Sequence, residues 1–142
     1  VVGRAALIQS VDSTRLLDKI EAAAERLGIT QEILMEINIG AEESKSGVGP
    51  DDLWPLLDAA AAKTHIKVRG LMAIPEPAEE DEAVRSPLRA MKALFDAHKD
   101  EFGWDTLSMG MSADMVQAVE EGATMVRVGS AIFGARHYPA KA

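Results

Sequence analysis

Two short stretches in the last third of the chain contain residue types that bind phosphate. The first covers residues 107–112 and the second residues 125–134, and each runs from apolar residues through glycine and serine into a helix-like pattern. Backbone N–H groups at such a strand-to-helix turn have no partner within the helix, so they can bind an anion. In a barrel of eight alternating strands and helices, the loops after the seventh and eighth strands form a phosphate site of this kind. A phosphate ligand is therefore the first hypothesis.

Arg127 lies in the second stretch, and strand alternation indicates where its side chain points. Residues two apart share a face, so Arg127 lies on the face of Gly129, opposite Val126 and Val128. If the valines pack against helices, the guanidinium points into the interior of the sheet. A buried unpaired charge is costly, so it needs an anion or an acceptor nearby. Two interpretations stay open: a bound ligand, favoured by the adjoining glycine turn, or an ion pair with a carboxylate such as Glu36.

Five apolar segments read as strands, and helical patterns follow them. The expected strands are residues 6–11, 33–39, 68–74, 107–112 and 125–129. The expected helices are residues 14–27, 51–62, 87–102 and 113–121, with a short helix after Ser130. Strictly alternating elements predict a parallel sheet with right-handed crossovers.

Capping residues predict where the helices begin and end. Ser13 offers a cap for the first helix and Gly28 ends it. Ser86 followed by Pro87 reads as a cap and a first helical position. Ser112 is expected to cap the helix after the fourth strand.

The same stretches closely resemble the C-terminal signature of the pyridoxal phosphate homeostasis protein family, which is related to the barrel domain of bacterial alanine racemases. The similar segments are residues 108–112 with Asp114, 122–124 and 126–134, preceded by 10–12, 36–38, 45–47 and 70–74. Their order along the chain makes the resemblance specific. The family usually has glutamine at the position of Glu36 and commonly threonine at that of Ser130.

The resemblance implies the cofactor pyridoxal 5'-phosphate (PLP). Ser108, Gly129 and Ser130 would hold its phosphate, Gly110 would permit close approach, and Arg127 would face the pyridine nitrogen. In the family, the lysine that forms a Schiff base with PLP lies at the end of the first strand, upstream of every residue here.

The implied fold class is α/β, a TIM-type (β/α)8 barrel. A complete barrel needs roughly 200 residues or more, so residues 1–142 would supply about the last five strands as the C-terminal portion of one domain. We therefore expect a fragment of a longer protein. Its unpaired strand edges would be completed by the missing N-terminal half of the barrel or by a second copy.

Two residues of the second strand and its loop are further candidates. Asn38 shares the polar face of the strand with Glu36, where it would bond a cofactor edge or join an internal hydrogen-bond network. Lys45 lies in the following polar loop. Of its two interpretations, a solvated surface lysine is favoured over a contact with a ligand anion.

Composition excludes several classes of function. A net charge of -8 and a pI of about 4.8 argue against nucleic acid and anionic membranes as partners. The chain has no cysteine, and its three histidines lack metal-ligand spacing, so no metal site is expected. No signal segment or membrane span is recognisable, so we expect a soluble, cytoplasmic protein.

Three functions compete. The leading one is a PLP-binding homeostasis protein, a carrier or regulator of cofactor supply without an established turnover reaction. The second is a PLP-dependent amino-acid racemase, which needs an acid–base pair that is commonly lysine and tyrosine, and Tyr138 is the single tyrosine of the chain. The third is a barrel enzyme that acts on another phosphorylated metabolite.

Overall fold

A parallel five-stranded sheet forms the centre of the computed structural model, which describes residues 1–40 and 46–134. The strands are β1 (Leu7–Val11), β2 (Gln31–Ile37), β3 (Ile66–Ala73), β4 (Thr106–Met111) and β5 (Met125–Arg127). Each strand pairs in parallel with the next one along the chain, so the order in the sheet is the order in the sequence. The predicted parallel sheet of alternating elements is confirmed.

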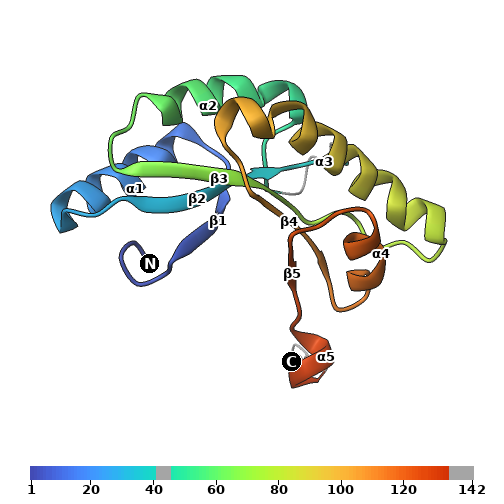
Figure 1. The fold of residues 1–142 in the computed structure, drawn as a ribbon. Helices are drawn as coiled ribbons and strands as arrows, with labels where there is room; N and C mark the ends of the chain where they lie inside the picture. The colour runs from blue at the N-terminus through green and yellow to red at the C-terminus, as the bar shows by residue number, and fades with distance from the viewer. Residues whose placement is uncertain (41–45, 135–142) are drawn as a thin grey trace, which may run out of the picture.

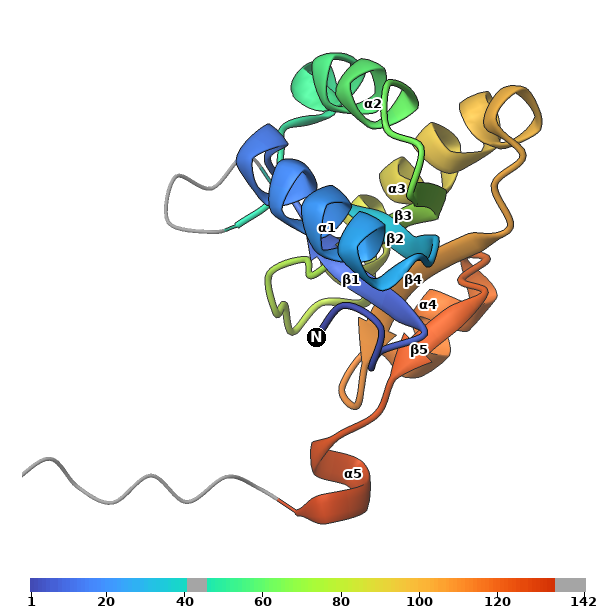
Figure 2. The same ribbon diagram turned by 90° about the vertical axis from the view of Figure 1, so that its left-hand side faces the viewer.

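The helices lie mainly on one side of this sheet. They are α1 (Thr14–Leu27), the 3-10 turn η1 (Pro50–Asp52), α2 (Leu53–Ala61), α3 (Asp81–Phe102), α4 (Met115–Glu120) and α5 (Ser130–Phe133). Figure 1 shows the sheet as an arch with α1, α2 and α3 over its convex side and α4 beside β4 and β5. In both Figure 1 and Figure 2, α5 lies below β5, away from the other helices.

Strand alternation divides the buried residues between the two faces of the sheet. Ile33 and Met35 of β2 belong to the apolar core on the helix side, together with Leu107 and Met109 of β4. Leu34 is also fully buried, but it projects to the opposite, concave face because it alternates with these neighbours. The near-continuous apolar character of β2 thus reflects burial on both faces.

The sheet is strongly curled. β1 and β5 are its two edge strands, yet Gln9 of β1 bonds to Ser108 of β4 and lies 3.3 Å from the sulfur of Met125 of β5. These contacts cross the concave face, so the described residues form an open half-barrel. The closed eight-stranded barrel stays a prediction for a longer protein.

The predicted caps of α1 are confirmed. The hydroxyl of Ser13 accepts the backbone N–H of Leu16, and Gly28 ends the helix in the left-handed conformation at φ 64°. The predicted start of α3 at Ser86 is wrong, because the helix begins at Asp81 and continues through Pro87. Acidic residues in the first turn and an ion pair between Arg85 and Asp81 stabilise this earlier start.

Proline also separates η1 from α2. Pro50 is the first residue of η1, and α2 then begins at Leu53, which leaves Pro55 in the first turn of α2. A proline there costs no intrahelical bond, because the first N–H groups of a helix have no partner in it.

Residues 1–40 and 46–134 contain neither a membrane-spanning helix nor a group of side chains suited to a metal ion. No helix in that part of the chain combines the length and apolar character needed to cross a membrane. No three histidine or acidic side chains there are grouped so that they could hold a metal ion.

Candidate functional site

A pocket of about 430 Å³ lies at the carboxyl ends of β3, β4 and β5. One wall is the segment after β3, residues 75–78, with Val84 of α3. The other wall is the turn of residues 111–114 after β4, together with Arg127 and residues 129–130. Three predicted site residues, Arg127, Gly129 and Ser130, are thereby brought together in one pocket.

Ser112 binds the turn after β5 rather than capping α4. Its hydroxyl accepts the backbone N–H groups of Gly129 at 3.2 Å and Ala131 at 3.1 Å. The N-cap position of α4 is Asp114, whose carboxylate accepts the N–H of Met111 at 2.7 Å. The predicted cap is wrong because Ser112 lies too early in the turn to reach the first N–H groups of α4. Its hydroxyl instead occupies donors of the kind expected to bind phosphate.

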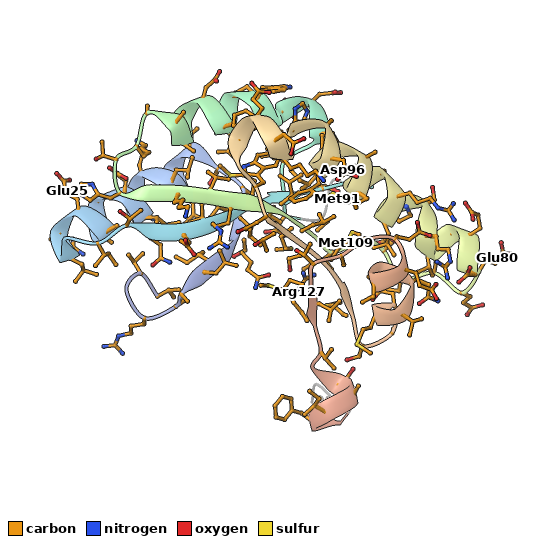
Figure 3. The ribbon with its side chains drawn as sticks, viewed as in Figure 1. Glu25, Glu80, Met91, Asp96, Met109 and Arg127 are labelled. Atoms are coloured by element: carbon orange, nitrogen blue, oxygen red, sulfur yellow. The ribbon has the colours of Figure 1, made fainter. Side chains whose placement is uncertain are left out.

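Arg127 points into the concave side of the sheet, as its strand alternation predicts (Figure 3). Its guanidinium donates to the hydroxyl of Ser108 at 2.6 Å and to the carbonyl oxygen of Ala73 at 3.0 Å. Partial burial lowers the pKa of Arg127, while the negative charges of Asp114 and Glu36 oppose that shift. A site with a partly desolvated guanidinium is suited to an electron-rich ligand.

The alternative ion pair between Arg127 and Glu36 does not form. The carboxylate of Glu36 is buried and accepts the hydroxyl of Ser46 at 2.6 Å. Among the described residues, the hydrogen bonds of Arg127 go to a hydroxyl and a carbonyl oxygen, so its charge is not neutralised by direct contact with a carboxylate. A ligand contact of Arg127 stays a prediction.

Ser108 lies behind Arg127 rather than on the pocket surface. Its side chain is fully buried, and its hydroxyl donates to Oε1 of Gln9 at 2.7 Å while it accepts from Arg127. Direct contact of Ser108 with phosphate stays a prediction. Gln9 was not among the residues predicted from the sequence. It could have been recognised as a polar side chain within a short, mainly apolar strand, where alternation places it on one face of the sheet.

Gly110 is explained by helix packing. Its φ is 92°, and a Cβ atom there would lie 2.3 Å from the Cβ of Ala118, so a side chain would push α4 away from β4. Its predicted role in ligand approach is not needed to account for the glycine and stays a prediction.

Asn38 lies apart from the larger pocket. It lines a smaller pocket of about 170 Å³ together with Glu36 and Ser46, and its backbone N–H donates to the carbonyl of Val48 at 2.8 Å. The structure does not bring Asn38 together with Gly129 and Ser130 in one cavity. Lys45 and Tyr138 lie outside the described residues.

The larger pocket combines two kinds of surface. Near Ser112 it is lined by hydroxyls and a guanidinium, which match a phosphate or another compact anion, while the N–H groups of Gly129 and Ala131 donate to Ser112. Opposite them, prolines and Val84 form an apolar wall that suits a flat ring.

Comparisons with known proteins show the family of the chain. Residues 2–137 match the family described as alanine racemase, N-terminal domain. The chain is 41% identical over 140 residues to a pyridoxal phosphate homeostasis protein of Aquifex aeolicus and 43% identical over 130 residues to one of Escherichia coli. These alignments cover 97% and 91% of this chain, and 61% and 54% of the relatives.

Among solved structures, the chain is similar to PipY of Synechococcus elongatus, solved with PLP bound. The TM-score is 0.81 at 28% identity, covering 94% of this chain and 63% of PipY. An alanine racemase of Clostridium difficile shares the fold, with a TM-score of 0.71 at 20% identity. The chain thus spans between about half and about three fifths of the length of the homeostasis proteins that it matches. Because the family match extends over almost all of its residues, the chain belongs to the family of the alanine racemase N-terminal domain.

Proposed function

We propose that the protein containing this chain binds PLP and acts in intracellular PLP homeostasis, as a carrier or regulator of the cofactor. The observation that carries the proposal is the convergence of Arg127, Gly129, Ser130 and Ser112 on one pocket at the carboxyl ends of three adjacent strands. The names of the relatives and the PLP bound to PipY support the choice of ligand.

We assign the phosphate of PLP to the turn after β5. It would accept the backbone N–H groups of Gly129 and Ala131, which the hydroxyl of Ser112 now occupies, and the hydroxyl of Ser130 would add a donor. Charge-assisted bonds of this kind are about twice as strong as neutral ones. The phosphate therefore has enough binding energy to displace Ser112 from those donors.

We assign the pyridine nitrogen to Arg127. When bound, PLP supplies an electron sink whose strength depends on protonation of that nitrogen. The guanidinium of Arg127 disfavours this protonation, because two positive charges would lie side by side. A site with Arg127 in this place therefore weakens the electron sink of the cofactor that it holds.

The longer protein would complete the barrel. We propose that strands upstream of β1 pair with β1 and β5 and close over Gln9, Ser108 and Arg127, and that the Schiff-base lysine lies on them. A cytoplasmic location belongs to the same proposal.

Equilibrium binding tests the proposal. The complete protein that contains the chain is titrated with PLP and with pyridoxal, which lacks the phosphate, and PLP should bind more tightly. Ser130→Ala should weaken PLP binding by about 1.5–3 kcal/mol, because a donor to a charged group is lost. Ser86→Ala, on the exposed face of α3, is the matched control and should leave binding unchanged. Equal affinity for PLP and pyridoxal would refute the phosphate site.

A second measurement separates the alternatives. The chain is incubated with PLP, reduced with borohydride and analysed by mass spectrometry. Absence of a pyridoxyl adduct on every lysine is expected, since the lysine of the family lies upstream. An adduct would show that the site is misplaced, whereas tight binding of sugar phosphates without PLP binding would favour an enzyme of another phosphorylated metabolite.

A further inference from the structure

The first residues of α3 form a wall of the pocket but are weakly anchored. Val84 and the preceding residues 75–78 line the pocket, whereas none of residues 81–86 is fully buried. Pro87 follows them. It has no N–H to donate to the carbonyl of Ala83, so the helix is weakened between this first segment and the part anchored by Leu88.

Arg85 connects this segment to α4. Its guanidinium donates to Asp81 at 2.6 Å within α3, and to Glu120 at 2.5 Å and Glu121 at 3.0 Å at the end of α4. The side chain of Arg85 is 19% exposed and that of Glu121 17% exposed. The contact with Glu121 is therefore partly shielded from water, whereas the carboxylates of Asp81 and Glu120 are more than half exposed.

A second arginine extends the same network. Arg89 donates to Glu82 at 2.6 Å and to Glu121 at 3.2 Å, and Gln117 of α4 donates to Asp81 at 3.2 Å. Single exposed ion pairs contribute little, but a network around a guanidinium with several partners is the exception. Figure 3 shows the start of α3, marked by Glu80, beside α4.

α4 belongs structurally to the opposite wall. It follows directly on the 111–114 turn that carries Ser112, and the chain then enters β5, which carries Arg127. The contacts of Arg85 with Glu120 and Glu121 thus link the two walls of one pocket from outside it.

We propose that Arg85 is a positioning residue for this pocket: its ion pairs with Glu120 and Glu121 hold residues 75–86 against the turns that bear Ser112 and Arg127, so that ligand retention depends on them. The inference rests on the proposed phosphate-binding function. Salt screens partly exposed charges, so the affinity for the ligand should fall as ionic strength rises. The fall should be larger than direct screening of the phosphate alone would cause.

Arg69 provides a matched control. Its guanidinium also bonds two carboxylates, Glu32 at 2.6 Å and Asp105 at 2.5 Å, and its side chain is 28% exposed. These partners lie near the amino-terminal ends of β2 and β4, away from the pocket. Arg85→Met and Arg69→Met therefore remove similar networks from different places.

The experiment measures affinity for PLP and for inorganic phosphate by calorimetry at low and high salt. Arg85→Met should bind both probes roughly 2- to 30-fold more weakly than wild type and lose the extra salt dependence. Arg69→Met should keep wild-type affinity and salt dependence. Arg85→Lys should restore part of the affinity, because it keeps the charge but loses the multiple contacts. If Arg85→Met does not fold, Glu121→Gln replaces it, since it removes one charge at constant size.

Hydrogen exchange gives a second readout that needs no ligand. Amide exchange of residues 75–86 should accelerate in Arg85→Met and stay at the wild-type rate in Arg69→Met. Unchanged exchange, or faster exchange with wild-type affinity, overturns the inference. If the complete protein that contains the chain binds neither probe, the proposed function fails, and exchange alone then decides whether Arg85 holds the wall.

Discussion

The guanidinium of Arg127 donates to the hydroxyl of Ser108 at 2.6 Å, from the edge strand β5 to its neighbour β4. That hydroxyl cannot turn toward the pocket without breaking a second bond, because its own proton goes to Gln9 at 2.7 Å. Ser108 therefore orients the guanidinium of Arg127 from the side away from the pocket. The hydrogen bonds that set this orientation join β5, β4 and β1.

Ser108→Ala should destabilise the fold by about 1–3 kcal/mol. The substitution leaves an N–H of Arg127 and the amide oxygen of Gln9 without their partner on the concave side of the sheet. Urea unfolding followed by circular dichroism measures the effect, and Ser86→Ala should stay within about 0.5 kcal/mol of wild type. An unchanged midpoint for Ser108→Ala would contradict the network.

Arg127→Gln should raise the pKa of the ring nitrogen of a bound pyridoxal derivative, because it removes a neighbouring positive charge. Pyridoxamine 5'-phosphate is a suitable probe, since it cannot form a Schiff base with a lysine. The absorbance of the bound ligand is recorded as a function of pH in both proteins. Identical titration curves would show that Arg127 does not face the ring nitrogen.

Gly70→Ala should cost at least about 3 kcal/mol or abolish folding. The φ of Gly70 is 151°, and an added Cβ would lie 1.9 Å from the carbonyl oxygen of Thr106 on the paired strand. Gly28→Ala is the control: its φ is also positive, but nothing lies within 4 Å, so only the left-handed backbone, about 1–2 kcal/mol, opposes it. Thermal unfolding of the two variants distinguishes a clash from backbone strain.

Glu21 should make stability depend on pH. Its carboxylate joins α1 to the turn before β3: burial raises the pKa of Glu21, but the hydrogen bonds accepted from Thr64 and His65 outweigh burial and lower it. A pKa that is lower in the folded state stabilises the fold above the ordinary value of 4.5, and that contribution is lost as pH falls through the folded value.

The measurement compares wild type with Glu21→Gln by urea unfolding at about pH 5 and about pH 3. The stability advantage of wild type should shrink toward the lower pH. An advantage that stays constant or grows would contradict a lowered pKa for Glu21.

The parallel sheet could be predicted because its signals are local. Apolar runs such as residues 33–37 alternate with amphipathic helices, and each strand pairs with the next one. The start of α3 was missed because the cap-like pair Ser86-Pro87 outweighed a local signal, the spacing of four residues between Asp81 and Arg85. The other partners of Arg85 lie 35 and 36 residues away, so no local pattern indicates them.

The site was predictable to the same extent. Arg127, Gly129 and Ser130 share one short segment, so alternation and turn chemistry place them in one pocket. The hydroxyl of Ser112, in contrast, accepts hydrogen bonds from residues that lie 17 and 19 positions later in the sequence. Gln9 and Ser108, which also bond to each other, are 99 positions apart. No local pattern indicates contacts between residues so far apart in the sequence. The contacts of Ser112 follow from the pairing of β4 with β5, and that of Gln9 follows from the curvature of the sheet.

That curvature has a consequence for how the chain folds. Each strand pairs with the preceding strand, so the sheet can form one strand at a time. Most pairing steps therefore cost the entropy of closing a single loop, which contains one helix. The contacts of Gln9 with Ser108 and Met125 bridge 99 and 116 residues and need all five strands in place. They should form after the rate-limiting step, so Gln9→Ala should speed unfolding while the folding rate stays nearly constant.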